Sequence, residues 1–220
     1  MDRLRLKIDL HVHTVCSGDS VNSVPEINRR CRDLSLDGYA VCDHDSVGSL
    51  AEAVASSDGL VVVPGLEVTA RGAHVICLDP SDVVPSGLSV VETVERIRGQ
   101  GATAVLAHPY GVPRSCVRFR EAEGAGFDAI EVANSAQVPF SLVMGWNRGL
   151  AERLGLPQTG GSDSHIPETV GRAYTVVEAA SREPEDVIKA IREGRTSVVG
   201  AGTGLQDRLR KIWRVLQKGQ

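Results

Sequence analysis

The chain has 220 residues, of which 42% are hydrophobic and 24% are charged. This length and apolar content suffice for a sizeable core, which excludes a disordered chain, a collagen-like repeat and a disulfide-stabilised miniprotein. The formal net charge is −4 and no long basic run occurs, so composition does not predict nonspecific binding to nucleic acid. We expect one domain over residues 1–220.

The N-terminal segment and the cysteines bear on the cellular compartment. Residues 1–7 alternate charged and apolar side chains without an apolar targeting core, and no stretch approaches about 18 consecutive apolar residues. The five cysteines include no C-x-x-C pair, which argues against a disulfide framework and a zinc ribbon. We therefore expect a soluble, cytoplasmic protein that does not bind membranes.

Short apolar or β-branched runs predict buried strands. They occupy residues 6–10, 39–42, 60–63, 74–78, 103–107, 129–132, 174–177 and 196–199. Helical patterns lie between many of these runs, at residues 25–34, 47–56, 88–98, 139–154 and 184–192. The alternation predicts an α/β fold with a mostly parallel sheet.

Two segments depart from this alternation. Arg71-Gly72 separates two apolar runs and predicts a hairpin turn, which would bring Glu67 close to His74. Residues 205–217 carry apolar side chains among basic ones at the spacing of an amphipathic helix. We expect this C-terminal helix to pack against the domain or to form a dimer, because its apolar stripe is short for a membrane anchor.

The six histidines are placed unusually, because none lies in a predicted helix. Most follow a predicted strand, and the last follows a Gly-Gly pair that we interpret as a turn. If the strands are parallel and curl into a barrel, their carboxyl ends meet at one rim. That rim would then hold His11, His13, His44, His108, Asp163 and His165.

These residue types have a chemical reason to be together. Imidazole is the commonest protein ligand of zinc, iron and manganese, and carboxylates complete or bridge the coordination of such ions. Asp19, Glu67 and Asp163 are the carboxylates at suitable positions. Asp19 also suits a plain turn and His74 a plain strand position, so for these two residues both interpretations stay open.

The sequence resembles the PHP (polymerase and histidinol phosphatase) family over most of its length. The motifs occur in family order as DLHVHT (9–14), SGDS (17–20), CDH (42–44), GLE (65–67), HVI (74–76), AHP (107–109) and GSDSH (161–165). Each motif is weak alone, but their order makes the resemblance specific. Cys42 departs from the pattern, since a threonine usually precedes Asp-His in this family.

The resemblance implies a PHP domain with the fold of a distorted seven-stranded (β/α)7 TIM-like barrel and two or three divalent ions of manganese, zinc or iron. One ion would be held by His11, His13, Glu67 and Asp163. Glu67 would bridge to a second ion held by His74 and His108. A third ion would be held by Asp19, His44 and His165, although family members differ at the position of Asp19.

The resemblance also implies a metal-dependent phosphoesterase, in which a metal-activated water hydrolyses a phosphate ester without a protein nucleophile. Glu67 would act as the bridging ligand. Asp163 or His165 would pass a proton to the leaving group. Asp9 and Asp43 are candidates to orient ligand imidazoles as hydrogen-bond acceptors.

We expect a small phosphorylated metabolite or nucleotide as the substrate, because an aromatic content of 4% offers few surfaces for stacking bases. Arg114, Arg118 and Arg172 are candidates to bind a second phosphate or carboxylate of that substrate. Their alternative role is a solvated surface. The alternative functions are a phosphodiesterase or exonuclease on oligonucleotides, an amidohydrolase, and a metal-stabilised accessory module without catalysis. The sequence leaves the oligomeric state open.

Overall fold

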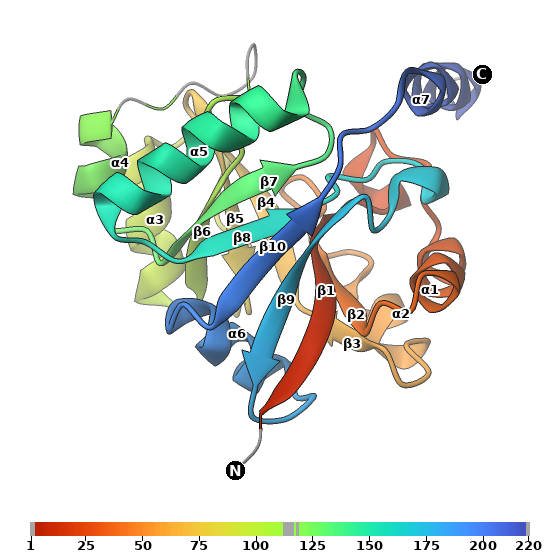
Figure 1. The fold of residues 1–220 in the computed structure, drawn as a ribbon, viewed down its shortest axis with the longest axis horizontal. Coiled ribbons are helices and arrows are strands. Elements are labelled where there is room, and N and C mark those ends of the chain that lie inside the picture. Colours follow the sequence, from red (N-terminus) through yellow and green to blue (C-terminus); the bar gives the residue numbers. More distant parts are fainter. Residues whose placement is uncertain (1–2, 112–116, 118, 219–220) are drawn as a thin grey trace.

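The computed structural model describes residues 3–111, 117 and 119–218, and its described part contains two five-stranded sheets (Figure 1). In spatial order the first sheet consists of β10 (Thr196–Gly200), β9 (Ala173–Ala179), β1 (Leu4–Val12), β2 (Gly38–Val41) and β3 (Val61–Val63). The second consists of β4 (Gly65–Ala70), β5 (Ala73–Leu78), β6 (Thr103–Ala107), β7 (Ala129–Asn134) and β8 (Gln158–Gly161).

Both sheets are mixed. The strands β1, β2 and β3 run parallel to one another, as do β6, β7 and β8. The hairpin β4–β5, its neighbour β6 and the strands β9 and β10 add antiparallel pairs. The predicted α/β class is therefore confirmed. The prediction of a mostly parallel sheet is wrong, because these returning strands reverse direction.

The two sheets meet at the end where the parallel strands finish. Isolated parallel bridges join Val12 to Ser164 and His44 to Glu67, one on each side of the junction. Among the described strands, ladder pairing does not continue from one sheet into the other. Closure into a seven-stranded barrel therefore stays a prediction, and the observed arrangement is two sheets that share one rim.

Seven helices occur in the described part of the chain. They are α1 (Val24–Asp33), α2 (Leu50–Ala55), α3 (Val90–Gly99), α4 (Phe119–Ala125), α5 (Phe140–Leu154), α6 (Pro184–Arg192) and α7 (Leu205–Lys218). Two 3₁₀ turns, η1 (Val15–Ser17) and η2 (Pro167–Thr169), follow the first and eighth strands. The serines that precede α1 and α3 form capping boxes with Glu26 and Glu92, which fixes where both helices begin.

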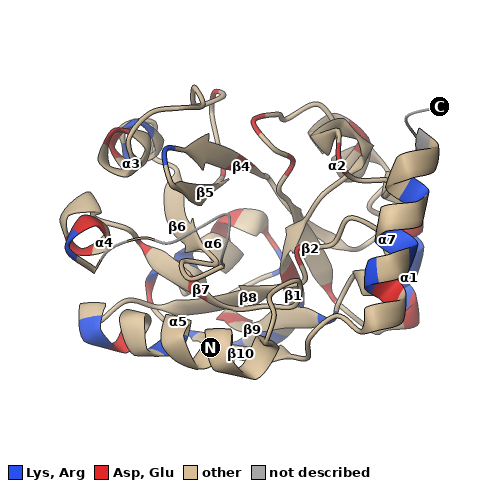
Figure 2. Cartoon of the chain, turned by 90° about the horizontal axis from the view of Figure 1, so that it is seen from above, with Lys and Arg blue, Asp and Glu red and all other residues tan. Residues whose placement is uncertain are grey.

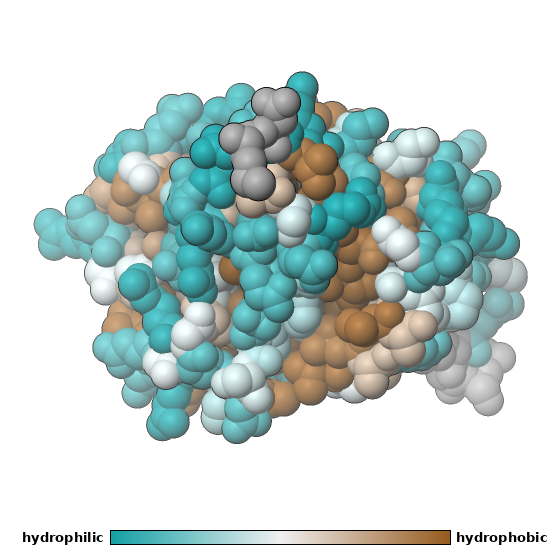
Figure 3. Space-filling view, turned by 90° about the horizontal axis from the view of Figure 1, so that it is seen from below, coloured by the Kyte–Doolittle hydropathy of each residue, from teal (hydrophilic) through white to brown (hydrophobic). Residues whose placement is uncertain are grey.

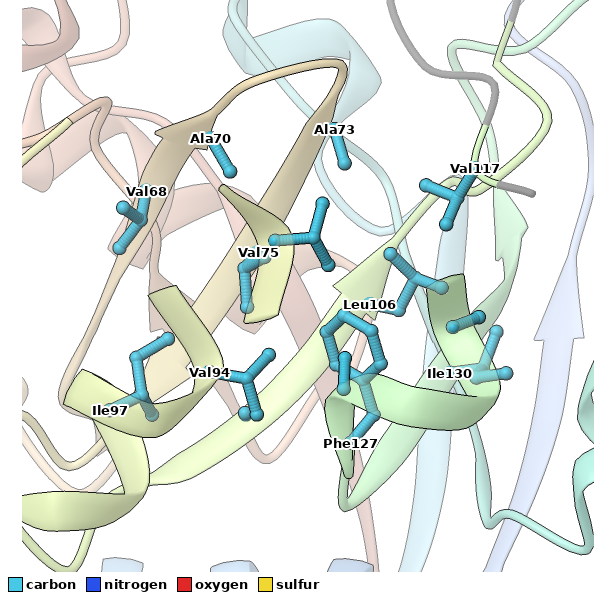
Figure 4. Close-up of a cluster of buried hydrophobic side chains, with 14 of the residues drawn as sticks. Val68, Ala70, Ala73, Val75, Val94, Ile97, Leu106, Val117, Phe127 and Ile130 are labelled. Carbon is cyan, nitrogen blue, oxygen red and sulfur yellow. The ribbon is translucent and has the colours of Figure 1, made fainter. Parts of the chain in front are cut away.

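The largest apolar cluster lies between the second sheet and the helices α3 and α4. Figure 4 shows Val94 and Ile97 of α3 directed towards Val75 of the hairpin, with Leu106 and Phe127 beside them. These side chains are almost fully buried, and burial of each contributes about 1.5–3 kcal/mol. The hairpin that carries Glu67 is therefore fixed from behind by the core.

The strand β8 was not expected, because its sequence Gln158–Gly161 contains the Gly-Gly pair that we interpreted as a turn. A Cβ atom on Gly161 would lie 2.4 Å from Cβ of His11, and one on Gly160 would lie 2.5 Å from Cγ1 of Val198. Only glycine permits this close crossing. The crossing brings the residues after β8 next to β1.

Helix α7 lies at the edge of the molecule, beside α1 (Figures 1 and 2). Its apolar side chains are exposed, namely Leu205, Leu209, Ile212, Trp213 and Leu216. The expected packing of this stripe against the domain is therefore not observed within the chain, and dimer formation stays a prediction. The end of the molecule that carries the N-terminus is largely hydrophilic, with a hydrophobic band near its centre (Figure 3). Across the described residues, no helix combines the length and hydrophobicity needed to cross a bilayer.

Candidate metal centre

Figure 2 looks onto the rim where the two sheets meet. His11 lies near the end of β1, and the extended backbone through Val12 places His13 on the same face. His44 follows β2, His108 follows β6, and Asp163 follows β8. The strands thus bring side chains from distant parts of the sequence to one place.

Glu67 of β4 occupies the centre of this group and is 1% exposed. Its Oε1 lies 3.1 Å from Nδ1 of His74 and 3.1 Å from Nε2 of His108. The predicted hairpin at Arg71-Gly72 is confirmed, and it is what places His74 beside Glu67. The distances from Oε2 of Glu67 are 3.1 Å to Nδ1 of His44, 3.3 Å to Nε2 of His13 and 3.4 Å to Nε2 of His11.

A second carboxylate, that of Asp163, also lies near His11 and His13. Its Oδ1 lies 3.2 Å from Nε2 of His13 and 3.6 Å from Nδ1 of His165. Asp19, in the loop after η1, adds Oδ2 at 3.1 Å from Nε2 of His165 and 4.0 Å from Nε2 of His44. All nine residues that the sequence singles out as ligand candidates therefore lie in one cluster.

Four sets of three donors within this cluster have ligand atoms within 4.8 Å of one another. The sets are His11/His13/Asp163, His11/Glu67/His108, His44/Glu67/His74 and His13/His44/His165. Glu67 is the one carboxylate that belongs to two of these sets, and His11, His13 and His44 also each belong to two. Asp19 lies outside these sets, although it contacts His165 of the last one.

The donor arrangement fits cations better than it fits hydrogen bonds between the side chains. Nε2 of His11 and Nε2 of His13 face each other at 3.1 Å. Nδ1 of His44, Nδ1 of His74 and Nε2 of His165 are buried near carboxylates, yet none makes a hydrogen bond of good geometry. Buried polar atoms are rarely left unsatisfied, and a bound divalent cation would satisfy these.

The electrostatics of the cluster suit the same role. Burial raises the pKa of Glu67, but the surrounding histidines, His11 foremost, hold it well below its ordinary value. Burial lowers the pKa of His13 to about 3. For His11 burial acts in the same direction, but Glu131, Glu67 and Asp163 hold its pKa well above the ordinary value. A cation would therefore meet an ionised Glu67 and a neutral His13, and would displace a proton from His11.

The hydrogen bonds behind the ligand candidates set their orientation. Oε1 of Glu131 lies 2.9 Å from Nδ1 of His11, and its Oε2 accepts from the backbone N–H of His108. Glu131 is 1% exposed in β7, and sequence reasoning missed it. The signal was present, because an acidic residue inside an apolar strand run requires a partner.

Asp9 and Asp43 do not contact imidazole rings as we had expected. Asp43 accepts from the backbone N–H and hydroxyl of Thr14 and from the hydroxyl of Ser49. Asp9 accepts from the backbone N–H groups of Ser162 and Gly171 and thereby ties β1 to the segment after β8. Both carboxylates position backbone, because strand ends at the rim leave N–H groups that need acceptors.

Two ligand candidates have a backbone conformation that L-residues rarely adopt. The φ angle is +53° at Asp163 and +29° at His108. Such strain persists only where the surrounding structure enforces it, and it gathers at functional sites. Here the backbone N–H of Asp163 donates to the carbonyl of His11 at 2.8 Å, which holds the carboxylate over the histidines.

A pocket of ≈ 320 Å³ opens beside the cluster. One wall consists of the ligand candidates His44, Glu67, His74, His108, Asp163 and His165. The other includes Gln137, Thr203, Arg208 and Lys211, which the sequence did not single out.

Unlike the ligand candidates, the substrate-binding candidates are not found together at the pocket in the described part of the chain. Arg172 is absent from the pocket lining, and its guanidinium forms an ion pair with Asp207 at 2.7 Å. Its position after a Gly residue gave no sign of this partner, which is distant in sequence. Arg114 and Arg118 lie outside the described residues.

Comparisons with known proteins agree with this geometry. A family model described as PHP-associated matches residues 147–196. An uncharacterized protein of Methanocaldococcus jannaschii is 29% identical over 178 residues, which cover 77% of this chain and 69% of that protein. A probable phosphatase of Syntrophotalea carbinolica is 24% identical, covering 91% of this chain and 98% of that one. A 5'-3' exoribonuclease of Haemophilus influenzae is 28% identical over 105 residues, covering 45% and 38%.

Solved structures share the fold. A two-domain protein of Bacteroides vulgatus containing a predicted PHP-like metal-dependent phosphoesterase superposes with a TM-score of 0.73 at 22% identity, covering 97% of this chain and 71% of that chain. PsfC of Pseudomonas syringae superposes with a TM-score of 0.75 at 17% identity, and covers 99% of both chains.

The two sheets with a shared rim of histidines and carboxylates define an α/β protein with the fold of PHP-like proteins and a candidate metal centre. In its fold, and in the segment that the PHP-associated family model matches, the chain is similar to the PHP family.

Proposed function

We propose that this protein hydrolyses a phosphate ester with the help of divalent metal ions at the rim cluster. The observation that carries the proposal is the convergence of nine histidine and carboxylate side chains in one cluster, six of which line a pocket that Arg208 and Lys211 also line. Cations on one side and guanidinium and ammonium groups on the other suit a substrate rich in negative charge. The probable phosphatase among the relatives supports the same reaction class.

Divalent ions bound at the cluster would activate water and neutralise the charge of the phosphoryl oxygens. Two or three ions of manganese, zinc or iron match the donor set, with His11, His13, His74 and His108 around the bridging Glu67. The third ion would be held by Asp19, His44 and His165. Mixed imidazole and carboxylate donors suit all three metals.

The protein's own part in proton transfer falls to Asp163 and His165. Both line the pocket, and Nδ1 of His165 lies 2.9 Å from the backbone carbonyl of Asp163. A carbonyl can only accept, so Nδ1 carries the hydrogen and Nε2 faces Asp19 at 3.1 Å. Where Nε2 of His165 is not taken up by a third ion, His165 with Asp19 would be arranged to hold a proton at the edge of the pocket, where a leaving alkoxide would take it up.

We propose a small phosphorylated metabolite or nucleotide as the substrate. The pocket of ≈ 320 Å³ is at the lower end of small-molecule sites, and no aromatic side chain is among the described residues that line it. A second candidate function is cleavage of phosphodiesters in nucleic acid. It is favoured by the relative that is a 5'-3' exoribonuclease, although the match spans 38% of that protein.

The test is phosphate release from a panel of phosphomonoesters and short oligonucleotides. Chelator-treated protein is assayed with and without manganese, zinc or iron(II), beside His108→Ala as the variant that removes a ligand candidate. Metal-dependent release from monoesters that His108→Ala lacks is the expected result. Cleavage of oligonucleotides alone would favour the phosphodiesterase.

The absence of any hydrolysis, together with a melting temperature that rises on adding metal, would contradict the proposal. That combination is the behaviour of a metal-stabilised accessory module. Hydrolysis of amides in place of esters would identify an amidohydrolase.

A further inference from the structure

The basic wall of the pocket comes from the start of α7, a helix that contributes nothing to the ligand cluster. Arg208 and Lys211 are three residues apart and so lie on one face of the helix, and both line the pocket. Basic residues recur along α7 (Figure 2). The side chains of Arg208 and Lys211 are either ordinary solvated charges or part of a preformed binding site, and their hydrogen-bond partners distinguish the two cases.

Arg208 is held in place by uncharged groups. Its Nε donates to the carbonyl of Thr203 at 3.0 Å, and its Nη1 donates to the carbonyl of Ala136 at 2.9 Å. In the part of the chain that the structure describes, no carboxylate forms an ion pair with Arg208. Burial lowers the pKa of its guanidinium, which nevertheless stays charged at neutral pH. The positive charge is thus fixed and not neutralised.

The neighbouring arginines on α7 are different. Arg214 pairs with Glu168 at 2.6 Å, and Arg210 pairs with Asp207 at 3.3 Å. Asp207 also lines the pocket, but Arg172 holds its other oxygen at 2.7 Å. Asp207, the one acidic side chain among the described residues of this wall, is therefore already compensated by two guanidinium groups, and the charge of Arg208 is left for a ligand.

The wall is tied directly to the ligand cluster. The backbone N–H of Thr203 donates to the carbonyl of Ser135 at 2.8 Å, and the hydroxyl of Ser135 donates to the carbonyl of Ser162 at 2.6 Å. Ser162 immediately precedes Asp163. Three consecutive contacts therefore fix Arg208 relative to a ligand candidate, which a mobile surface charge would not require.

We propose that Arg208 and Lys211 form a subsite for a second anionic group, so that the substrate carries a phosphate or carboxylate in addition to the phosphate ester that reacts. This rests on the proposed function, because the first anionic group is the one directed to the metal cluster. A guanidinium with two donors already used can still present its remaining N–H groups to an oxyanion, and the ammonium of Lys211 adds a point charge.

The first experiment measures binding of inorganic phosphate to chelator-treated protein by calorimetry, in the wild type, Arg208→Ala, Lys211→Ala and Arg214→Ala. We expect Arg208→Ala and Lys211→Ala each to weaken binding at least about tenfold, the effect of losing a hydrogen bond to a charged group. Arg214→Ala, which removes a paired arginine of the same helix, should bind like the wild type. Melting temperatures of all variants check that α7 and the domain remain folded.

The second experiment compares metal-loaded enzymes on glucose 1-phosphate and glucose 1,6-bisphosphate. The wild type should prefer the bisphosphate, and Arg208→Ala should reduce that preference about tenfold. Equal phosphate binding in all four proteins, or no binding in the wild type, would overturn the subsite. Phosphate binding that depends on Arg208 without hydrolysis of any ester would leave the anion site standing and contradict the proposed function.

Discussion

The pocket has a strand wall and a helix wall, and the chain builds them differently. The strand wall carries Glu67, which is 1% exposed and fixed in the β4–β5 ladder, and the fully buried His11 and His13 contact Glu67 without lining the pocket themselves. The helix wall carries Arg208 and Lys211 on a peripheral helix whose apolar side chains are exposed.

This difference separates two requirements of the proposed metal-assisted hydrolysis. Metal ligands must be held within a fraction of an ångström, which buried strand ends with hydrogen-bonded side chains achieve. Recognition of the rest of a substrate tolerates looser groups and can be altered without rebuilding the core. Substitutions on the strand wall should therefore abolish hydrolysis, and substitutions on the helix wall should change which substrate is preferred.

The largest effect is expected for Glu67→Gln. The substitution removes the charge that five histidines share, so we expect metal content to fall and hydrolysis to drop by well over about 100-fold, because even partners behind ligands cost 10- to 100-fold. Metal analysis by mass spectrometry and phosphate release check both. Glu178→Gln, an exposed glutamate on β9, is the control. Full metal occupancy in Glu67→Gln would show that Glu67 is not a ligand.

Glu131→Gln should have the next largest effect, since it alters orientation and not ligation. A glutamine can keep one hydrogen bond but cannot accept from both Nδ1 of His11 and the N–H of His108 with carboxylate strength. We expect a loss of about 10- to 100-fold in metal affinity, measured by chelator competition. Excess metal should restore much of the activity, which distinguishes a positioning residue from a direct ligand. If the affinity is unchanged, Glu131 has no role in orienting His11.

The sequence predicted the strand wall far better than the helix wall. The period of two places His11 and His13 on one face, and His44 and His108 follow strand runs, so the convergence of these four could be deduced. For Asp19 and His74 the pattern alone left a turn and a plain strand position open, and only the family resemblance favoured ligands. The strand β8 could not be deduced, because Gly160 and Gly161 are required by the close approach of His11 and Val198, which only the folded chain shows.

The helix wall was missed for a different reason. A basic residue on an amphipathic helix looks like an ordinary solvated charge, and nothing local distinguishes Arg208 from Arg214. The difference lies in partners far along the chain: Ala136 for the first arginine and Glu168 for the second. Arg172 illustrates the converse error, since Asp207 occupies its guanidinium.

Removal of metal should destabilise the strand wall selectively. Saturating metal at about 100 times its dissociation constant adds about 2.7 kcal/mol to the free energy of unfolding. For a chain of this size we expect chelation to lower the melting temperature by about 5–10 °C. The shift should be smaller in Glu67→Gln and similar to the wild type in Arg208→Ala.

The same shift should depend on pH. The carboxylates around His11 hold its pKa well above the ordinary value, so at low pH a proton competes with the cation for this residue. Metal-dependent stabilisation should therefore grow as pH rises from 6 to 8, and calorimetric scans at several pH values measure it. A shift that is larger at pH 6 than at pH 8 would contradict this competition.

The smallest effect is expected on the outer face of α7. Trp213 is 61% exposed, so Trp213→Ala should change the free energy of unfolding by less than about 0.5 kcal/mol in urea titrations. Ile8→Ala, at 0% exposure in β1, is the reference and should cost about 2–5 kcal/mol. A cost above about 2 kcal/mol for Trp213→Ala would mean that this face is covered in solution. If that cost also increased with protein concentration, the cover would be a second copy of the chain, and the helix wall would then be as firmly fixed as the strand wall.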